Sequence, residues 1–248
     1  YRELLTSDDI DAVLVTTRHA DHAEITLAAL EAGKHVFVEK PMATTLSDSR
    51  KILEAAEKYK RIVRVGFNRR FSPMLQAMKK AIGPNGIRMV SVRVNIGDIS
   101  DHWSNTEAEG GRLLGEGVHF FDFCNWFLDA EPISVQAVAG GVPSITNPNA
   151  MIMIRYPDGS AAQVIYTTLG HANSGKEYFE AFGNGRTVRS DDYRSFEAFG
   201  ISASVSRRRR GDKGQRGILE EFGAALRNQP YGTPGADARA GLLSTWIA

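Results

Sequence analysis

The chain has 248 residues and a balanced charge, with 30 lysine and arginine residues against 29 aspartate and glutamate residues. A formal net charge of +1 gives no general attraction to nucleic acid or to anionic lipid, so neither partner is predicted. The sequence has no run of about 18 apolar residues of the kind that spans a membrane. Its single cysteine, Cys124, cannot form an internal disulfide, which predicts a reducing, cytoplasmic location.

The first 71 residues alternate between apolar runs and helical patterns. The apolar runs at residues 11–17, 36–38 and 62–67 are typical of strands buried on both faces. Between them, residues 19–32 and 45–58 have the composition or the 3.6-residue periodicity of helices. This order predicts a Rossmann-type parallel sheet over residues 1–71, in an α/β arrangement.

The segment from Gly33 to Pro41 is the most informative part of this region. Gly33 follows a helix, as glycine commonly does at a left-handed C-cap. Glu39 and Lys40 come at the carboxyl end of the strand at 36–38, where ligands bind in open α/β sheets. A solvated charged turn is the alternative when Glu-Lys-Pro is taken alone. Because strand–helix–strand units flank the segment, we expect Glu39 and Lys40 to belong to a functional site.

The pattern changes after the third predicted strand. Pro73 suits the first turn of a helix that continues to residue 82, and most later segments alternate apolar and polar residues, as strands with one wet face do. This pattern predicts an α+β domain over residues 72–248, built on an open antiparallel sheet. We expect strands at residues 89–95, 135–139, 150–156, 161–168 and 176–183, a hairpin at 183–186, and a helix at 113–128.

The predicted helix at 113–128 carries candidate catalytic residues. His119 lies three residues after Glu116 and three before Asp122, so the three side chains share one helical face. Carboxylates beside a histidine fix its tautomer and raise its basicity, which suits proton transfer near neutral pH. A structural, hydrogen-bonded histidine on an amphipathic helix is the alternative.

The sequence lacks one feature of a dinucleotide-binding sheet. Such a sheet ordinarily opens with a strand and a Gly-x-Gly-x-x-Gly turn, whose amides contact the pyrophosphate. No such turn precedes residues 11–17, and the sequence begins with Tyr1. We therefore expect a truncated sheet, belonging to a longer protein whose first strand and phosphate loop lie upstream.

Three motifs, in order along the chain, carry a resemblance to a known family. They are Thr16-Thr17-Arg18-His19 with His22, the run from Ala32 to Pro41 followed by Val65 to Phe71, and the run from Gly110 to Asp122. Together they resemble the Gfo/Idh/MocA oxidoreductases over nearly the whole chain. The Gly-Glu-Gly-Val-His form of the last motif is most similar to the branch found as the C-terminal half of bi-domain oxidoreductases.

The resemblance implies an oxidoreductase that uses NAD or NADP and moves a hydride to or from a sugar-like or polyol substrate. It implies that Lys40 and His119 are catalytic. Glu116 is the third catalytic candidate, because it shares a helical face with His119. The resemblance implies a substrate and oligomerisation domain over residues 72–248. We expect cofactor contacts from Thr16, Thr17, Arg18, His22, Glu39, Lys40 and Asn68, and substrate contacts from Lys40, Arg70, His119 and Asp122. His102 and Trp103 lie in the polar loop at residues 97–111 and are candidates to hydrogen-bond and stack on a sugar; packing within the protein is the alternative for this pair. The resemblance also implies a homo-oligomer formed through the antiparallel sheet and a fused upstream half similar to an alcohol dehydrogenase. The histidines and Cys124 match no zinc-site spacing, so no metal is predicted.

One position departs from the family pattern. Many family dehydrogenases carry an aspartate four residues before the histidine, and this sequence has Gly115 there. Glu116 lies about 100° farther round a helix. An enzyme in which Glu116 takes the orienting role is the first interpretation. The alternative is a non-catalytic module that senses the cofactor or binds a partner; Gly115 favours this alternative, whereas Lys40 and His119 favour the enzyme.

Overall fold

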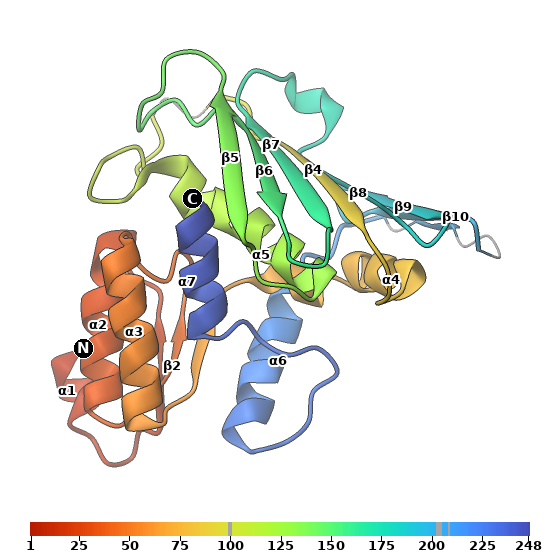
Figure 1. Ribbon diagram of the computed structural model, residues 1–248. Coiled ribbons are helices and arrows are strands. Elements are labelled where there is room, and N and C mark those ends of the chain that lie inside the picture. The colour runs from red at the N-terminus through yellow and green to blue at the C-terminus, as the bar shows by residue number, and fades with distance from the viewer. Residues whose placement is uncertain (99–100, 202–204, 208) are drawn as a thin grey trace. The chain divides into compact units, whose positions relative to one another are not determined.

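The computed structural model describes residues 1–98, 101–201, 205–207 and 209–248 (Figure 1). The chain divides into two compact units, neither of which is a single continuous segment. Unit 1 contains Tyr1–Phe67, Trp103–Asp122 and Arg216–Ala248, and unit 2 contains Asn68–His102 and Phe123–Gln215. The predicted domain boundary between residues 71 and 72 stays a prediction. Within the described ranges, no helix is both long enough and apolar enough to cross a membrane.

The parallel sheet predicted for the N-terminal region is present in unit 1, with three strands in the order β1-β2-β3. The elements of this unit are α1 (Arg2–Leu5), β1 (Ala12–Val15), α2 (His19–Glu31), β2 (His35–Val38), α3 (Leu46–Tyr59), β3 (Val63–Val65), η2 (Leu113–Gly117), the start of α5 (Val118–Leu128), α6 (Gln215–Leu226) and α7 (Ala238–Ile247). The strand register places six valines on one face of the sheet, namely Val13, Val15, Val36, Val38, Val63 and Val65.

Helices cover both faces of this small sheet. Phe37 and Arg64 are register partners on the face opposite the valines. The Phe37 ring lies 5.7 Å from the Phe222 ring of α6, and Arg64 Nε lies 2.9 Å from Glu221 Oε2 of the same helix. Helices α2 and α3 therefore cover the valine face, where they lie side by side (Figure 1). Five of the six valines are buried, and Val13 is half-buried. Full burial of one valine contributes roughly 1.5–3 kcal/mol to stability.

The helix ends around β2 follow the predictions from the sequence. Gly33 has a φ of +75°, and the amide of Lys34 donates to the carbonyl of Ala29 at 2.9 Å, which is the bond that closes a Schellman cap. At the start of α3, the Thr45 hydroxyl accepts a hydrogen bond from the Asp48 amide at 3.0 Å. The chain therefore leaves β2 through a short turn between two fixed helix ends, and this turn contains Glu39 and Lys40.

The larger sheet lies in unit 2 and has eight strands in the order β11-β10-β9-β8-β4-β7-β6-β5. The predicted open antiparallel sheet is confirmed, with one parallel pair, β4 and β7. The elements of unit 2 are η1 (Asn68–Phe71), α4 (Pro73–Ile82), β4 (Met89–Asn95), the end of α5, β5 (Ser134–Ala139), β6 (Ala150–Arg155), β7 (Ala161–Thr167), η3 (Ala172–Ser174), β8 (Glu177–Gly183), β9 (Arg186–Asp191), β10 (Ser195–Phe199) and β11 (Val205–Arg207).

One face of this sheet forms the core of unit 2. Helix α4 packs on β8, β9 and β10. Phe123 of α5 lies against Phe179 of β8, with the ring centroids 4.8 Å apart. Four segments, β9, β10, β11 and α6, were not predicted from the sequence. Helix α6 contains Gly217 and Gly223, which lower its intrinsic helix propensity.

Candidate active site

The carboxyl ends of the parallel strands carry most of the predicted cofactor residues. Thr16, Thr17 and Arg18 follow β1 directly and are exposed, whereas Glu39 and Lys40 follow β2 and are half-buried. The amide of Gly66, just after β3, donates to the carbonyl of Val38 at 2.8 Å. The three strand ends are therefore held at one edge of the sheet, the position at which open α/β sheets bind ligands.

His22 holds the turn that follows β2. It is 1% exposed, and its Nδ1 lies 2.7 Å from the carbonyl oxygen of Pro41, while its Nε2 lies 3.3 Å from that of Thr17. A carbonyl only accepts, so the shorter contact assigns the ring proton to Nδ1 in the neutral tautomer. His22 positions the turn that contains Lys40; its predicted contact with the cofactor stays a prediction.

Gly66 makes room for the Glu39 carboxylate. A Cβ on Gly66 would lie 2.8 Å from Glu39 Oε2, closer than carbon and oxygen atoms normally approach. The same Glu39 oxygen accepts a hydrogen bond from the Lys40 amide at 3.3 Å. Glycine at this strand end therefore allows the Glu39 side chain to lie across β3.

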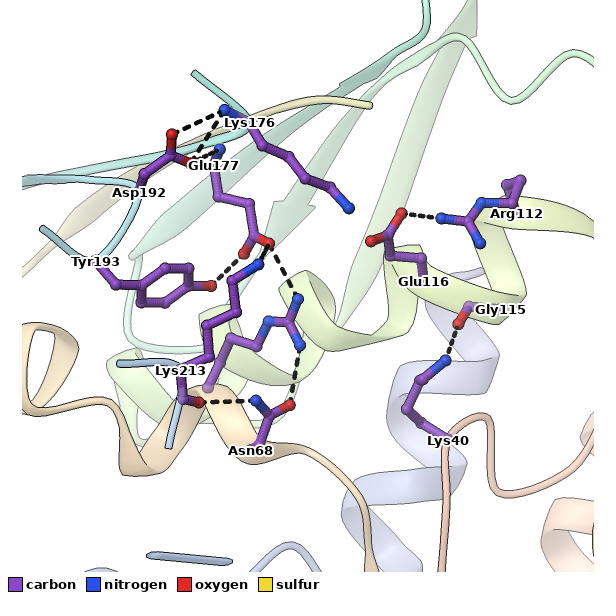
Figure 2. A network of polar contacts seen from close by, with 11 residues as sticks. Lys40, Asn68, Arg112, Gly115, Glu116, Lys176, Glu177, Asp192, Tyr193 and Lys213 are labelled. Atoms are coloured by element: carbon purple, nitrogen blue, oxygen red, sulfur yellow. Dashed lines mark hydrogen bonds and ion pairs between the residues drawn. The ribbon is translucent and has the colours of Figure 1, made fainter. Parts of the chain in front are cut away.

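Lys40 is bound to the segment that precedes α5 (Figure 2). Its Nζ donates to the carbonyl of Gly115 at 2.8 Å. Residues Leu113–Gly117 form a π-helical turn, closed by a hydrogen bond from the Val118 amide to the carbonyl of Leu113. The helix predicted over residues 113–128 therefore begins with a wider turn, a feature that often occurs at functional sites.

The three candidates for proton transfer, Glu116, His119 and Asp122, are all buried, with exposed fractions of 8%, 4% and 0%. Glu116 forms an ion pair with Arg112, one helical turn earlier (Figure 2). The His119 ring lies 5.9 Å from the Phe67 ring, centroid to centroid. The sequence interpretation missed Arg112, although its spacing of four residues from Glu116 suits an ion pair within a helix. The catalytic roles of these residues stay predictions.

His19 is a further site residue that the sequence interpretation missed. Its ring lies over Gly115, where an added Cβ would be 2.8 Å from His19 Cε1. Its Nδ1 lies 2.9 Å from the carbonyl oxygen of Glu109, and its backbone amide donates to the Glu109 carboxylate at 2.9 Å. The only signal in the sequence was a second histidine three residues before His22. The sequence pattern gives no sign that the loop containing Glu109, 90 residues later, packs on His19.

His19 is neutral at physiological pH. Burial lowers the pKa of His19 to about 4, and the positive charge of Lys40 acts in the same direction, whereas the hydrogen bond to Glu109 opposes them. Because the Glu109 carbonyl can only accept, the proton of the neutral ring lies on Nδ1. The other ring nitrogen, Nε2, is then an acceptor.

Trp103 borders the same group. Its ring contacts His19 edge-on, with the centroids 4.6 Å apart, and the guanidinium of Arg18 lies 4.3 Å from the centre of the tryptophan ring. Trp103 is 43% exposed. The neighbouring His102 belongs to unit 2 and is half-buried. Substrate contacts from His102 and Trp103 stay predictions.

A second polar group lies in unit 2 around the fully buried Glu177 (Figure 2). Its carboxylate accepts hydrogen bonds from Arg69 at 3.1 Å, from Lys213 at 2.6 Å and from the Tyr193 hydroxyl. Burial alone would raise the pKa of Glu177, but the two cations and the hydrogen bonds lower it below its ordinary value. This cluster fastens η1 and the loop before α6 to the start of β8.

Two predicted binding residues lie in η1. The Asn68 side chain donates to the carbonyl of Lys213 at 2.8 Å and accepts from Arg69 at 2.9 Å. Arg70 is 8% exposed. The roles predicted for Asn68 and Arg70 in binding cofactor and substrate stay predictions. In the described part of the chain, no group of three or more histidine, cysteine, aspartate or glutamate side chains could hold a metal ion.

Comparison with known families agrees with this arrangement. Residues 1–67 match the model described as "Oxidoreductase family, NAD-binding Rossmann fold". Residues 81–189 match the model of the GFO/IDH/MocA C-terminal domain. The two models match in chain order and together cover well over half of the chain. The chain belongs to the Gfo/Idh/MocA family. The predicted family and the nicotinamide cofactor are thereby confirmed.

Several relatives in the Gfo/Idh/MocA family are dehydrogenases of inositol. Inositol 2-dehydrogenase 3 from Saccharopolyspora erythraea is 37% identical over 55% of this chain and 40% of its own length. Myo-inositol 2-dehydrogenase from Thermotoga maritima is 27% identical over 99% of this chain and 78% of its own length. The oxidoreductase domain protein from Kribbella flavida has the same fold, with a TM-score of 0.83 and 22% identity over 98% of this chain and 78% of its own. The chain thus matches less than half of the first relative's length.

Proposed function

We propose that the protein is an NAD(P)-dependent oxidoreductase that moves a hydride between nicotinamide and a carbinol carbon of a sugar-like or polyol substrate. The observation that carries this proposal is the ammonium group of Lys40, held 2.8 Å from the Gly115 carbonyl at the carboxyl edge of the parallel sheet. Membership of the family supports the reaction type. The inositol dehydrogenase names of two relatives support a polyol substrate.

The groups at the strand ends suit a nicotinamide dinucleotide. Thr16 and Thr17 offer hydroxyl groups and Arg18 offers a guanidinium, all exposed after β1. These are donor types that hydrogen-bond phosphate and carboxamide oxygens. Glu39 offers a carboxylate, which accepts hydrogen bonds from ribose hydroxyls. When bound, the cofactor would accept or give the hydride.

The remaining chemistry falls to side chains of this chain. The ammonium of Lys40 would donate a hydrogen bond to the substrate oxygen, which stabilises the negative charge that develops there. His119 would take or give the hydroxyl proton. Glu116 and Asp122 would hold the His119 imidazole in the required tautomer and orientation. Removal of the Glu116 charge would then weaken proton transfer without removing any contact to the substrate.

A non-catalytic sensor of the same fold is the second candidate. The observation that favours it is Gly115, whose space is occupied by the ring of His19. A sensor would bind cofactor or sugar at the same sheet edge and release no product. The two candidates therefore differ in turnover, and they share the binding residues.

The test uses the full-length protein with NAD or NADP and a panel of polyols that includes myo-inositol, sorbitol and glucose. We expect reduced nicotinamide to form, at a rate that saturates with one of these polyols. Binding without turnover, seen as a saturable change in cofactor fluorescence while absorbance stays constant, would support the sensor. Absence of both signals would contradict the two candidates together.

We also propose that the protein self-associates through the open face of the large sheet. Exposed apolar side chains share this face, and they are Met89, Val138, Met151, Met153, Phe182 and Phe199. Exposed apolar side chains gathered on one sheet face often mark an interface. Met153→Glu should shift the protein toward monomer in sedimentation velocity, whereas Leu219→Glu, at an exposed position of α6, should not. A fused upstream half and a cytoplasmic location stay predictions.

A further inference from the structure

His19 is a buried imidazole that the proposed reaction does not use. It is 4% exposed, yet it lies beside the carbonyl that receives the Lys40 ammonium. Each nitrogen of this ring can bind one hydrogen-bond partner. Nδ1 has one in the Glu109 carbonyl, at 2.9 Å. Among the residues that the structure describes, none forms a hydrogen bond with Nε2 of His19.

The position of the ring is fixed from three sides. The Glu109 carboxylate binds the backbone amide of His19 at 2.9 Å, and the Glu109 carbonyl binds Nδ1. Trp103 lies edge-on to the ring at 4.6 Å. Gly115 lies under Cε1, at a separation that no larger residue would permit. A ring held in this way cannot turn Nε2 toward another protein group without losing its bond to Glu109.

The chemistry of Nε2 identifies the group that it can bind. Because Nδ1 carries the proton, Nε2 has a lone pair and can accept a hydrogen bond, but it cannot donate one. The partner must therefore carry an O–H or N–H group. The ammonium of Lys40 is a donor, and it binds the carbonyl of Gly115, the residue on which the His19 ring packs. A molecule with several hydroxyl groups can use one oxygen as an acceptor for Lys40 and another hydroxyl as a donor to His19.

We propose that His19 is a substrate-binding residue, whose Nε2 accepts a hydrogen bond from a hydroxyl group of the polyol that Lys40 binds. This inference rests on the proposed function for the identity of the substrate class. It explains why Gly115 is needed, because a side chain at that position would displace the imidazole. It also predicts selectivity for free polyols over polyols in which that hydroxyl is methylated.

Two substitutions separate binding from structure. His19→Asn keeps an N–H close to the position of Nδ1 and can still donate to Glu109, but it has no acceptor at the position of Nε2. His19→Gln places an amide oxygen near the position of Nε2 and gives up the bond to Glu109. We expect His19→Asn to raise KM for myo-inositol about tenfold or more, with kcat and the KM for NAD changed by less than about threefold. His19→Gln should have a KM nearer to that of the wild type. The opposite order would overturn the proposal, because it would assign His19 a purely structural role.

A spectroscopic measurement tests the inference where turnover is absent. The ¹⁵N signals of the His19 imidazole report each nitrogen separately, and a hydrogen bond to an unprotonated nitrogen shifts its signal strongly. Addition of myo-inositol, sorbitol or glucose to the full-length protein with NAD should shift Nε2 and leave Nδ1 nearly unchanged. No Nε2 shift with any of the three polyols would overturn the proposal. Failure of the proposed function is a separate result, since it appears as no reduced nicotinamide in the wild type.

Discussion

Gly115→Ala is expected to destabilise the protein through a single close contact. The added Cβ would lie 2.8 Å from Cε1 and 3.5 Å from Nδ1 of His19. The first distance is about 0.7–1.2 Å shorter than an optimal contact between carbon atoms. The imidazole cannot move away freely, because it is bound to Glu109 and packed on Trp103. The ring must shift and weaken these contacts.

The magnitude follows from opposing effects. Overpacking of this kind costs about 1–3 kcal/mol, and loss of the hydrogen bond to Glu109 falls within that range. Alanine regains about 0.5–1 kcal/mol relative to glycine in a helical segment. The net loss in the free energy of unfolding should lie between about 0 and 2.5 kcal/mol, with a central value of about 1 kcal/mol. Gly117→Ala is the matched control in the same π-helical turn, since its Cβ would meet Phe121 at an ordinary 3.4 Å. It should leave stability unchanged or raise it slightly.

Urea unfolding followed by tryptophan fluorescence measures both variants against the wild type. The decisive arm repeats Gly115→Ala in a His19→Ala background, where the ring is absent. There the cost of Gly115→Ala should fall by at least about 1 kcal/mol, because contacting residues are energetically coupled. Equal stability of the Gly115 and Gly117 variants would refute the reasoning. So would an unchanged cost of Gly115→Ala after removal of the imidazole.

Three further outcomes are expected. Lys40→Met should lower kcat of the full-length protein roughly 100- to 1000-fold, as loss of one preorganised hydrogen-bond donor does. Cofactor affinity, measured by fluorescence titration, should stay nearly unchanged. A kcat within a few-fold of the wild type would contradict this prediction. Glu177→Gln should cost about 3 kcal/mol in urea unfolding, because it leaves the Arg69 charge uncompensated. Since the folded pKa of Glu177 lies below its ordinary 4.5, the wild type loses this contribution as pH falls below about that value, and the variant should show a shallower loss in acid. The pKa of His19 is about 4 in the folded protein and 6.5 as its ordinary value, so between these pH values the unfolded chain binds a proton that the folded protein does not. The free energy of unfolding should therefore decline as pH falls from 6.5 to about 4. His19→Asn should make this decline shallower in thermal unfolding scans.

The sequence by itself determined the local order of this protein. The apolar runs at residues 36–38 and 62–67 and the glycine cap at Gly33 predicted the parallel strands and the helix boundary, because these features depend on neighbouring residues alone. The third strand itself is shorter than its run and ends at Val65. The Glu39–Pro41 turn was placed correctly at the carboxyl end of β2 for the same reason. The strands of the large sheet with clear alternation were predicted within about one residue, whereas the more polar β9–β11 were not.

Tertiary structure decided what those local elements meet. The ring of His19 over Gly115, the ion pair of Arg64 with Glu221 and the enclosure of Glu177 join residues far apart in the chain. No periodicity encodes such pairs, since each depends on the three-dimensional path of the intervening chain. The π-helical turn is a further case: the sequence predicts a helix there, but the wider turn that carries the Gly115 carbonyl appears only in the folded backbone. The sequence therefore located Lys40, and only the fold showed that its ammonium binds the carbonyl of Gly115, a residue that packs against the neutral His19 ring.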